Sequence, residues 1–459
     1  MKIEVLYGKI LAFTKAIFLR KPQNGESLRS SFLIPSRGTH GPEGMDWWTS
    51  TRTNLLSLDV VQAAMKLNPN LANGDEETFQ NLLSESIREN LKNPALFDFS
   101  KVLPAQVDTL FDAISPKSKN AFAQAFCDHF VRRCEGAIRD WLVAFPLVRI
   151  FCKTVSLGYD GLTLVASDDV TTWGNLASTY PDAGMFDLRN SRWFMDAASA
   201  PFLPDAPSGW LLCVVNGTMD GARRAAGKRM RTFVAVLFAT AHRDYWLRFS
   251  KSGAEVSQYS VQFAASHGHG PNNRLASIGM IIPPVLNEWT IEERTLQEVK
   301  EWYRKRLCTS ESIQSRATTA TQFFHFGVIA DEIERFIHMF IVLDTLFGER
   351  GKVESTILHG VSLVFPGHAV WQKKTGKLFD LRSEIVHGEC SEIAEWEGQE
   401  SYMREFESSV FQDVVTLAAF ALLTRFDVQT ARIPEQWYCA LSRPFSRTLF
   451  KLAGWLNRL

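Results

Sequence analysis

The chain has 459 residues, 46% of them hydrophobic, which is enough apolar material for about two or three domains that each bury a core. This composition excludes an intrinsically disordered protein. Lysine and arginine together number 50, as do aspartate and glutamate, so no overall charge favours nucleic acid or a membrane surface.

The seven cysteines are scattered along the chain without a single Cys-x-x-Cys pair. Their odd number and spacing argue against a disulfide framework and a zinc ribbon, and predict a reducing, cytoplasmic compartment. We expect no secretory signal, because Lys9 and Lys15 interrupt the first apolar run. We also expect no membrane span, since the richest apolar window, VVTLAAFALL at 414–423, is far too short.

Residues 1–144 predict a mainly helical N-terminal region, to which the sequence assigns no role. From Leu55 to Ala144, apolar residues recur at the spacing of a helical face, and Pro and Asn separate the segments. The segments are VVQAAMKL, FQNLLSESIRENL and KNAFAQAFCDHFVRRCEGAIRDWLVAF.

Residues 145–285 predict a mixed α/β region that could sense a signal or bind RNA. Its apolar runs are short, rich in β-branched and aromatic residues, and separated by Gly, Asp and Asn, which is typical of strands. The runs are PLVRIFCKTVSL, LTLVAS, GWLLCVVNG, RTFVAVLFATA and YSVQFAAS.

A cationic run, GARRAAGKRMR at 221–231, lies in this region and contains no acidic residue. It could hold an RNA backbone, although a solvated loop is the commoner explanation of such a run. The candidate RNA-binding residues are Arg223, Arg224, Lys228, Arg229 and Arg231.

Residues 286–459 predict a helical domain. Thr290 and Glu293 have the spacing of a capping box and predict a helix start, whereas the polar stretch 309–321 predicts a linker. The domain ends in an amphipathic basic tail, RPFSRTLFKLAGWLNRL, which we expect to pack on its own domain or on a dimer partner rather than on a membrane.

Two predicted helices of this domain each carry a charge on an apolar face. On 378–390, Arg382 points in the same direction as Leu378 and Ile385, and on 328–347 Asp344 lies among isoleucines and phenylalanines. An unpaired buried charge costs several kcal/mol, so we expect Asp344 and Arg382 to meet, directly or through water. The simplest alternative is a structural ion bridge.

His387 follows Arg382 by five residues and directly precedes Gly388, which predicts a helix C-terminus. The imidazole then lies on the last turn, near the side chain best suited to bind phosphate. Histidine acts as an acid or a base near neutral pH because its ordinary pKa is about 6.5.

The stretch from Arg382 to His387 resembles the R-x4–6-H motif of HEPN domains. Its surroundings resemble the Apea-like HEPN subgroup, in which a helix ending in an acidic residue and Leu-Phe-Gly, here Asp344 to Gly348, precedes the motif helix. The resemblance covers residues 320–427 and implies a helical bundle. Arg382 and His387 match the motif positions, whereas Ser383 stands where the family usually has Asn, Asp or His.

The resemblance implies a metal-independent endoribonuclease without a cofactor, typically a toxin or an antiphage abortive-infection effector. It also implies a homodimer in which two motifs line one cleft, with Asp344 and Ser383 in supporting roles. Cleavage by the RNA 2′-hydroxyl needs a proton acceptor, a proton donor and a positive charge, and DNA would be inert. The remaining domains would sense a trigger, for example a phage-derived one. The alternative is an inactive HEPN-like module that dimerises or binds a partner.

Other motifs are weaker. His387-Gly-Glu389 matches the H-x-E of zinc deaminases, but no P-C-x-x-C follows. His267 and His269 could hold a metal, although paired loop histidines without acidic neighbours are more often solvated. The sequence contains no Walker loop, G-x-S-x-G or H-E-x-x-H. We therefore predict no metal site.

Overall fold

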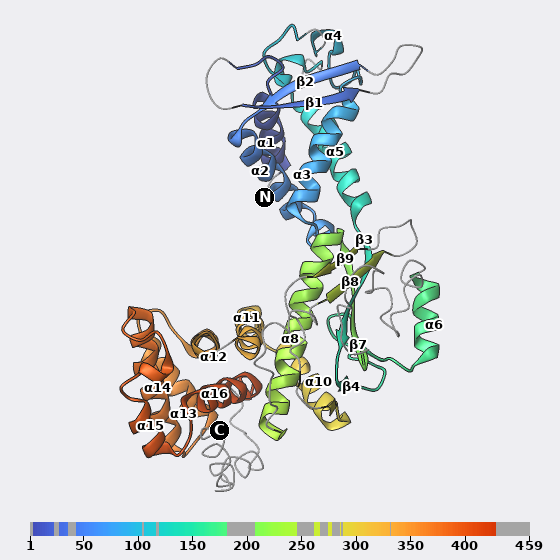
Figure 1. The fold of residues 1–459 in the computed structure, drawn as a ribbon. Helices are drawn as coiled ribbons and strands as arrows, with labels where there is room; N and C mark the ends of the chain where they lie inside the picture. The colour runs from blue at the N-terminus through green and yellow to red at the C-terminus, as the bar shows by residue number, and fades with distance from the viewer. Residues whose placement is uncertain are drawn as a thin grey trace, which may run out of the picture.

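The computed structural model confirms a predominantly helical α+β protein with a mixed central region (Figure 1). A helical N-terminal unit lies at one end, a sheet occupies the middle, and further helices extend from the sheet to one side. The structure describes residues 3–22, 27–34, 43–102, 105–115, 119–180, 207–245, 261–266, 274–277, 285, 288–330 and 332–427.

The N-terminal unit is mainly helical, as predicted, and also contains a hairpin that the sequence analysis missed. Strands β1 and β2 pair antiparallel, with Leu28 opposite Thr49. The elements are α1 (Ile3–Lys15), β1 (Leu28–Ile34), β2 (Glu43–Thr49), α2 (Thr51–Leu67), η1 (Pro69–Leu71), α3 (Glu76–Asn90), α4 (Phe99–Val102), η2 (Leu110–Ala113) and α5 (Lys119–Ala137).

The N-terminal unit has its own hydrophobic core and meets the sheet at a buried polar joint. Asp75 caps α3 by accepting a hydrogen bond from the Thr78 N–H at 2.7 Å. The same carboxylate accepts a 2.5 Å hydrogen bond from the Thr218 hydroxyl, directly after strand β7. One side chain therefore both starts a helix and fixes the unit to the centre of the molecule.

The central sheet has six antiparallel strands in the order β5-β6-β7-β3-β8-β9. The middle strand β3 begins at Arg139, so the predicted boundary between residues 144 and 145 falls inside it. The strands are β3 (Arg139–Leu147), β5 (Val155–Ser156), β6 (Leu162–Ala166), β7 (Gly209–Gly217), β8 (Val261–Ser266) and β9 (Arg274–Ser277); β4 (Ile150–Phe151) pairs separately with β10 (Trp289–Thr290).

Helix α8 (Met219–Tyr245) lies against the sheet and joins it to the C-terminal helices (Figure 1). The predicted strand in 231–241 belongs to this helix. It reads as a strand because the helix is buried all round from Thr232 to Ala241, which removes the helical periodicity. The shorter helix α6 (Val170–Thr179) follows β6.

Two predictions about the start of the C-terminal helices are wrong. Thr290 belongs to strand β10, and the cap position of α10 is Glu292, so the predicted capping box is absent. The predicted linker 309–321 is helical, because its small residues Ala317 and Ala320 face the core and allow close packing. The helices are α10 (Glu293–Leu307), α11 (Glu311–Ile329), α12 (Glu332–Phe347), α13 (Val353–Val364), α14 (Ala369–His387), η5 (Ile393–Glu395), α15 (Gln399–Phe406) and α16 (Val410–Thr424).

One continuous hydrophobic core unites the sheet with the C-terminal helices, from Trp141 to Phe426, so the predicted central and C-terminal regions share a core. Among the described residues, no single helix has the length and apolar character needed to cross a membrane. Helices α15 and α16 pass that test only as a pair bent by 65°, and α16 is packed inside this core.

Candidate functional site

The motif residues Arg382 and His387 lie in the last two turns of α14. The helix ends as predicted, because Gly388 adopts the left-handed conformation, with φ of 77°. The Gly388 N–H donates to the Ile385 carbonyl at 3.1 Å and the Glu389 N–H donates to the Glu384 carbonyl at 2.9 Å. These two bonds form a Schellman motif, which ends the helix directly after an exposed His387.

Arg382 does not occupy the centre of the buried face, so that prediction is wrong. The face of α14 that meets the core runs through Trp371, Leu378 and Leu381, and Leu381 takes the place that had been assigned to Arg382. Arg382 lies half-buried at the edge of this face. Its side chain is therefore partly exposed rather than enclosed in the bundle.

The predicted direct pairing of Asp344 with Arg382 is also wrong. In the part of the chain that the structure describes, no ion pair within 4.0 Å and no hydrogen bond joins the two side chains. Arg316 instead holds the end of α12, donating to the carbonyls of Thr345 at 2.7 Å and Gly348 at 2.8 Å. Asp344 and Ser383 are both half-buried.

The buried ion pair of these helices joins α14 to α16, and the sequence analysis did not predict it. Lys374 on α14 is 8% exposed and lies 2.8 Å from the Asp413 carboxylate on α16. Asp413 also accepts hydrogen bonds from Tyr402 at 2.8 Å and Ser408 at 2.5 Å, and burial raises the pKa of Tyr402. The sequence could have predicted a buried Lys374, because this residue lies three residues after Trp371 and four before Leu378, which puts all three on one helical face.

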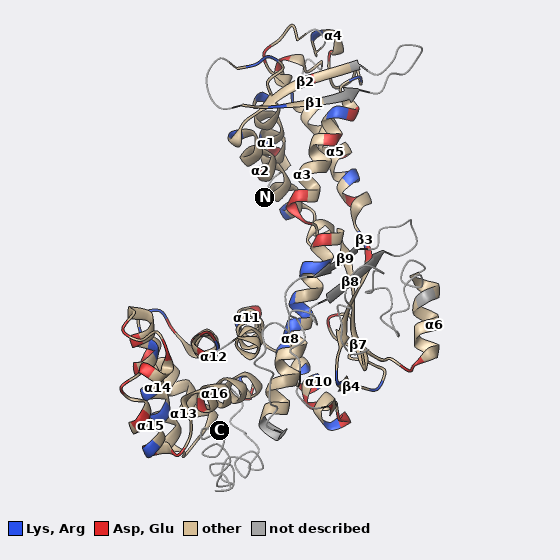
Figure 2. Cartoon of the chain, in the orientation of Figure 1, with Lys and Arg blue, Asp and Glu red and all other residues tan. Residues whose placement is uncertain are grey.

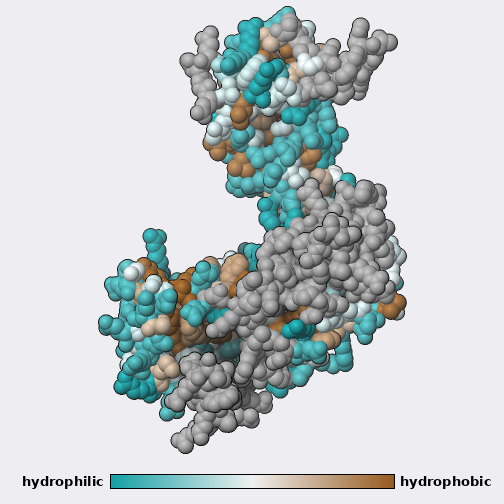
Figure 3. All heavy atoms as spheres, viewed as in Figure 1, coloured by the Kyte–Doolittle hydropathy of each residue, from teal (hydrophilic) through white to brown (hydrophobic). Residues whose placement is uncertain are grey.

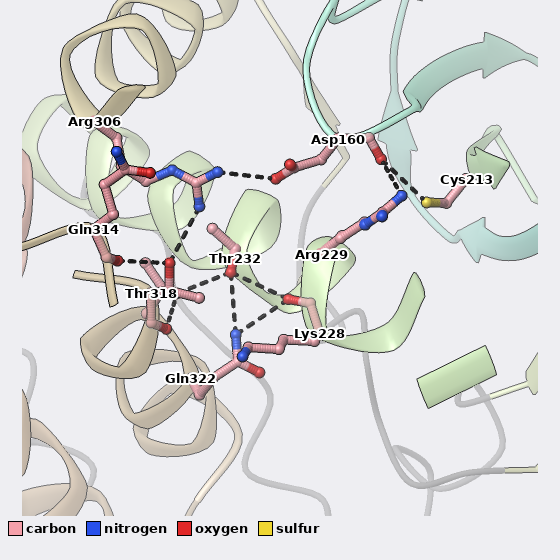
Figure 4. Close-up of polar contacts among 10 residues, drawn as sticks. Asp160, Cys213, Lys228, Arg229, Thr232, Arg306, Gln314, Thr318 and Gln322 are labelled. Atoms are coloured by element: carbon pink, nitrogen blue, oxygen red, sulfur yellow. Dashed lines mark hydrogen bonds and ion pairs between the residues drawn. The ribbon is translucent and has the colours of Figure 1, made fainter. Parts of the chain in front are cut away.

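The cationic run 221–231 is the first part of α8, not a loop, and the blue bands of Figure 2 mark it. A helix distributes the five cations over several directions. Arg223 pairs with Asp220 at 2.8 Å. Arg229 points to the sheet and donates to the Asp160 carbonyl at 3.0 Å, beside Cys213 (Figure 4).

The other three cations, Arg224, Lys228 and Arg231, are spaced by four and three residues and lie along one side of α8. Arg224 and Lys228 are exposed, whereas Arg231 is half-buried. The five predicted RNA-binding residues therefore divide into three on one stripe and two with partners elsewhere.

Two other histidines of the C-terminal helices, His338 and His359, differ in setting. His338 is half-buried against Phe323 and Phe326, and burial lowers its pKa. His359 is exposed on α13. His267, His269 and the C-terminal tail lie outside the described residues. Within those residues, no group of three or more His, Cys, Asp or Glu side chains is arranged to hold a metal ion.

No family model, curated protein or solved structure matches this chain. The candidate site is therefore defined by its own geometry: an arginine without an ion-pair partner among the described residues, and an exposed histidine five residues later, where α14 ends.

Proposed function

We propose that the C-terminal helices form a HEPN-type endoribonuclease that cleaves RNA without a metal ion, with Arg382 and His387 as the catalytic residues. One observation carries the proposal. A half-buried arginine with no ion-pair partner among the described residues and an exposed histidine five residues later both belong to the end of α14. A phosphodiester is the ligand that this pair suits, because arginine matches phosphate oxygens and histidine exchanges protons near neutral pH.

In the proposed reaction, His387 takes the proton from an RNA 2′-hydroxyl, and the 2′-oxygen attacks the adjacent phosphorus. Arg382 neutralises the charge that develops on the non-bridging oxygens. The bond from phosphorus to the 5′-oxygen breaks, and that oxygen receives a proton. The products are a 2′,3′-cyclic phosphate and a 5′-hydroxyl. Ser383 and Asp344 keep supporting roles in this proposal. Both are half-buried, Ser383 next to Arg382 along α14 and Asp344 in the last turn of α12.

One chain supplies one His387, whereas the reaction uses a proton acceptor and a proton donor, so the proposal includes a homodimer. Exposed apolar side chains on α13 and α14 support a second copy on these helices, with Val386 directly beside His387 and the other two toward the start of α14. Val386 on α14 is 55% exposed, Val370 on the same helix 47%, and Leu363 on α13 40%. Figure 3 shows hydrophobic residues gathered on the C-terminal helices. Covering such surface is the usual driving force of association.

The proposed role is that of a toxin or an antiphage effector. The N-terminal unit and the sheet would restrain the nuclease or sense a trigger such as a phage product. The sheet shares one continuous core with the C-terminal helices, with α8 in the middle, and the hydrogen bond between Asp75 and Thr218 fixes the N-terminal unit to the sheet. These connections support a mechanical coupling of this kind.

The test is cleavage of total RNA by the purified full chain in EDTA, together with growth after overexpression. We expect His387→Ala and Arg382→Gln each to lower cleavage about 100-fold or more and to relieve toxicity. His129→Ala, a half-buried histidine on α5 in the N-terminal unit, is the matched control and should cleave normally. Equal behaviour of the wild type and His387→Ala in both assays would leave only a non-catalytic binding module.

A further inference from the structure

We propose that α8, α11 and α12 together form a platform for single-stranded nucleic acid, with the phosphates along Arg224 and Lys228 and a base stacked on Phe326. The inference rests on the proposed function, since it names the form of RNA that the nuclease would receive. The platform residues differ from the proposed catalytic residues of α14, so binding can be tested without cleavage.

The phosphate-binding part is the stripe on α8. Arg224, Lys228 and Arg231 follow one side of the helix over about 10 Å, at 1.5 Å per residue. The nearby carboxylate of Asp75 interacts electrostatically with Arg224, but it is buried and already accepts hydrogen bonds from Thr218 and Thr78. The exposed cations are therefore available to a polyanion.

A polar joint fixes the stripe against α11 (Figure 4). Gln322 donates from Nε2 to the Lys228 carbonyl and to the Thr232 hydroxyl, both at 3.1 Å. Its Oε1 accepts a 2.8 Å hydrogen bond from Arg231 Nε. Thr232 and Thr321 place their hydroxyl oxygens 3.0 Å apart. The joint holds the two helices in register, so the cations and the residues of α11 form one preorganised surface.

The aromatic part begins where the stripe ends. The Arg231 guanidinium lies 5.9 Å from the ring centre of Phe326, which is 37% exposed. The rings of Phe323 and His338 lie 6.5 and 5.8 Å from the Phe326 ring, and support it from the protein side. An exposed ring next to a guanidinium is the arrangement on which an unpaired base stacks.

Single-stranded nucleic acid fits this surface better than an acidic peptide does. A peptide would use the cations but leave the aromatic face without a planar partner, whereas each nucleotide offers both a phosphate and a base. A duplex keeps its bases stacked and would also lose the aromatic contact.

Helix α12 connects the platform to the proposed catalytic helix. His338 belongs to the platform, and Phe340, two residues further along α12, lies 5.7 Å from the Phe379 ring of α14. A strand held on α8 and α11 would therefore lie next to α12, the helix whose Phe340 contacts α14.

The aromatic arm of the test uses fluorescence anisotropy with a labelled 12-nucleotide single-stranded RNA, in EDTA and in the His387→Ala background. We expect Phe326→Ala to weaken binding about 10-fold and Phe326→Trp to preserve it. Phe151→Ala is the matched control, since Phe151 is 39% exposed on β4, and it should bind normally. Normal binding by Phe326→Ala would overturn the platform.

The charge arm compares two double reversals. Arg224→Glu with Lys228→Glu should weaken binding about 30-fold or more and reduce its salt dependence. Arg52→Glu with Lys66→Glu, two exposed cations on α2, should leave binding unchanged. Equal losses in both pairs would mean nonspecific attraction and overturn the proposal, and so would a preference for duplex over single strands or for an acidic peptide.

The two proposals fail separately. Single-stranded DNA lacks the 2′-hydroxyl and should still bind the platform, so DNA binding that responds to Phe326→Ala keeps the platform even where His387→Ala changes no cleavage. Conversely, RNA cleavage that depends on His387 while Phe326→Ala binds and cleaves normally keeps the nuclease and removes the platform.

Discussion

The buried pair Lys374–Asp413 gives the sharpest test of how the C-terminal helices are held together. It joins α14 to α16 at 2.8 Å, and the Lys374 ammonium also lies 4.7 Å from the Trp371 ring and donates to Ser408 at 2.8 Å. Replacing one partner leaves the other charge buried, which costs about 3–5 kcal/mol.

The environment of Asp413 sets the order of the effects. Lys374→Met leaves a carboxylate that still accepts from Tyr402 and Ser408, so we expect a loss near 3 kcal/mol. Asp413→Leu strands both the ammonium and the Tyr402 hydroxyl, so we expect about 5 kcal/mol. The double variant should cost less than the sum of the two, because no charge remains buried.

The neighbouring residue supplies the control. Lys373 lies on the same helix and pairs with Glu405 on α15, but its side chain is 65% exposed. Lys373→Met should cost less than about 1 kcal/mol. The measurement is native-state hydrogen exchange over α14 and α16 in the full chain, because two hydrophobic cores make a single unfolding transition an unsafe readout. Similar losses for Lys373→Met and Lys374→Met would refute the reasoning.

Two further predictions concern pH and the end of α14. Burial lowers the pKa of His242 to about 4, so as pH falls from about 6.5 to 4 the unfolded chain takes up a proton that the folded chain does not. Native-state hydrogen exchange over α8 and α16 should then show up to about 3 kcal/mol of stability lost at pH 4, and His242→Leu should reduce this pH dependence. Gly388→Ala should cost about 1–2 kcal/mol by hydrogen exchange over α14, and Gly388→Asn should cost less, because asparagine tolerates a positive φ and alanine does not. Equal costs would contradict this account.

The sequence predicted the features that depend on neighbours along the chain. The strands β6 and β7 fall inside the predicted runs LTLVAS and GWLLCVVNG, where alternation and turn residues are local signals. The predicted secondary structure was wrong where a helix is buried on all sides or where most of its residues are polar. The apolar run 231–241 became the middle of α8, and the polar run 309–321 became the start of α11.

The candidate site divides in the same way. The position of His387 at a helix end was predictable, because the left-handed conformation of Gly388 is a property of that residue and its immediate neighbours. The burial of Arg382 was not predictable, because a helical wheel does not decide which of two adjacent residues faces the core, and in the structure Leu381 does so.

The sequence by itself therefore determined the helical class, several strands, the end of α14 and the residues available for chemistry. Only the tertiary structure decided which charge is buried, Lys374 rather than Arg382, and which cations of α8 share a surface with Phe326. Local preferences act through the backbone of a few consecutive residues, whereas burial and pairing depend on segments that are distant along the chain and meet only in the folded protein.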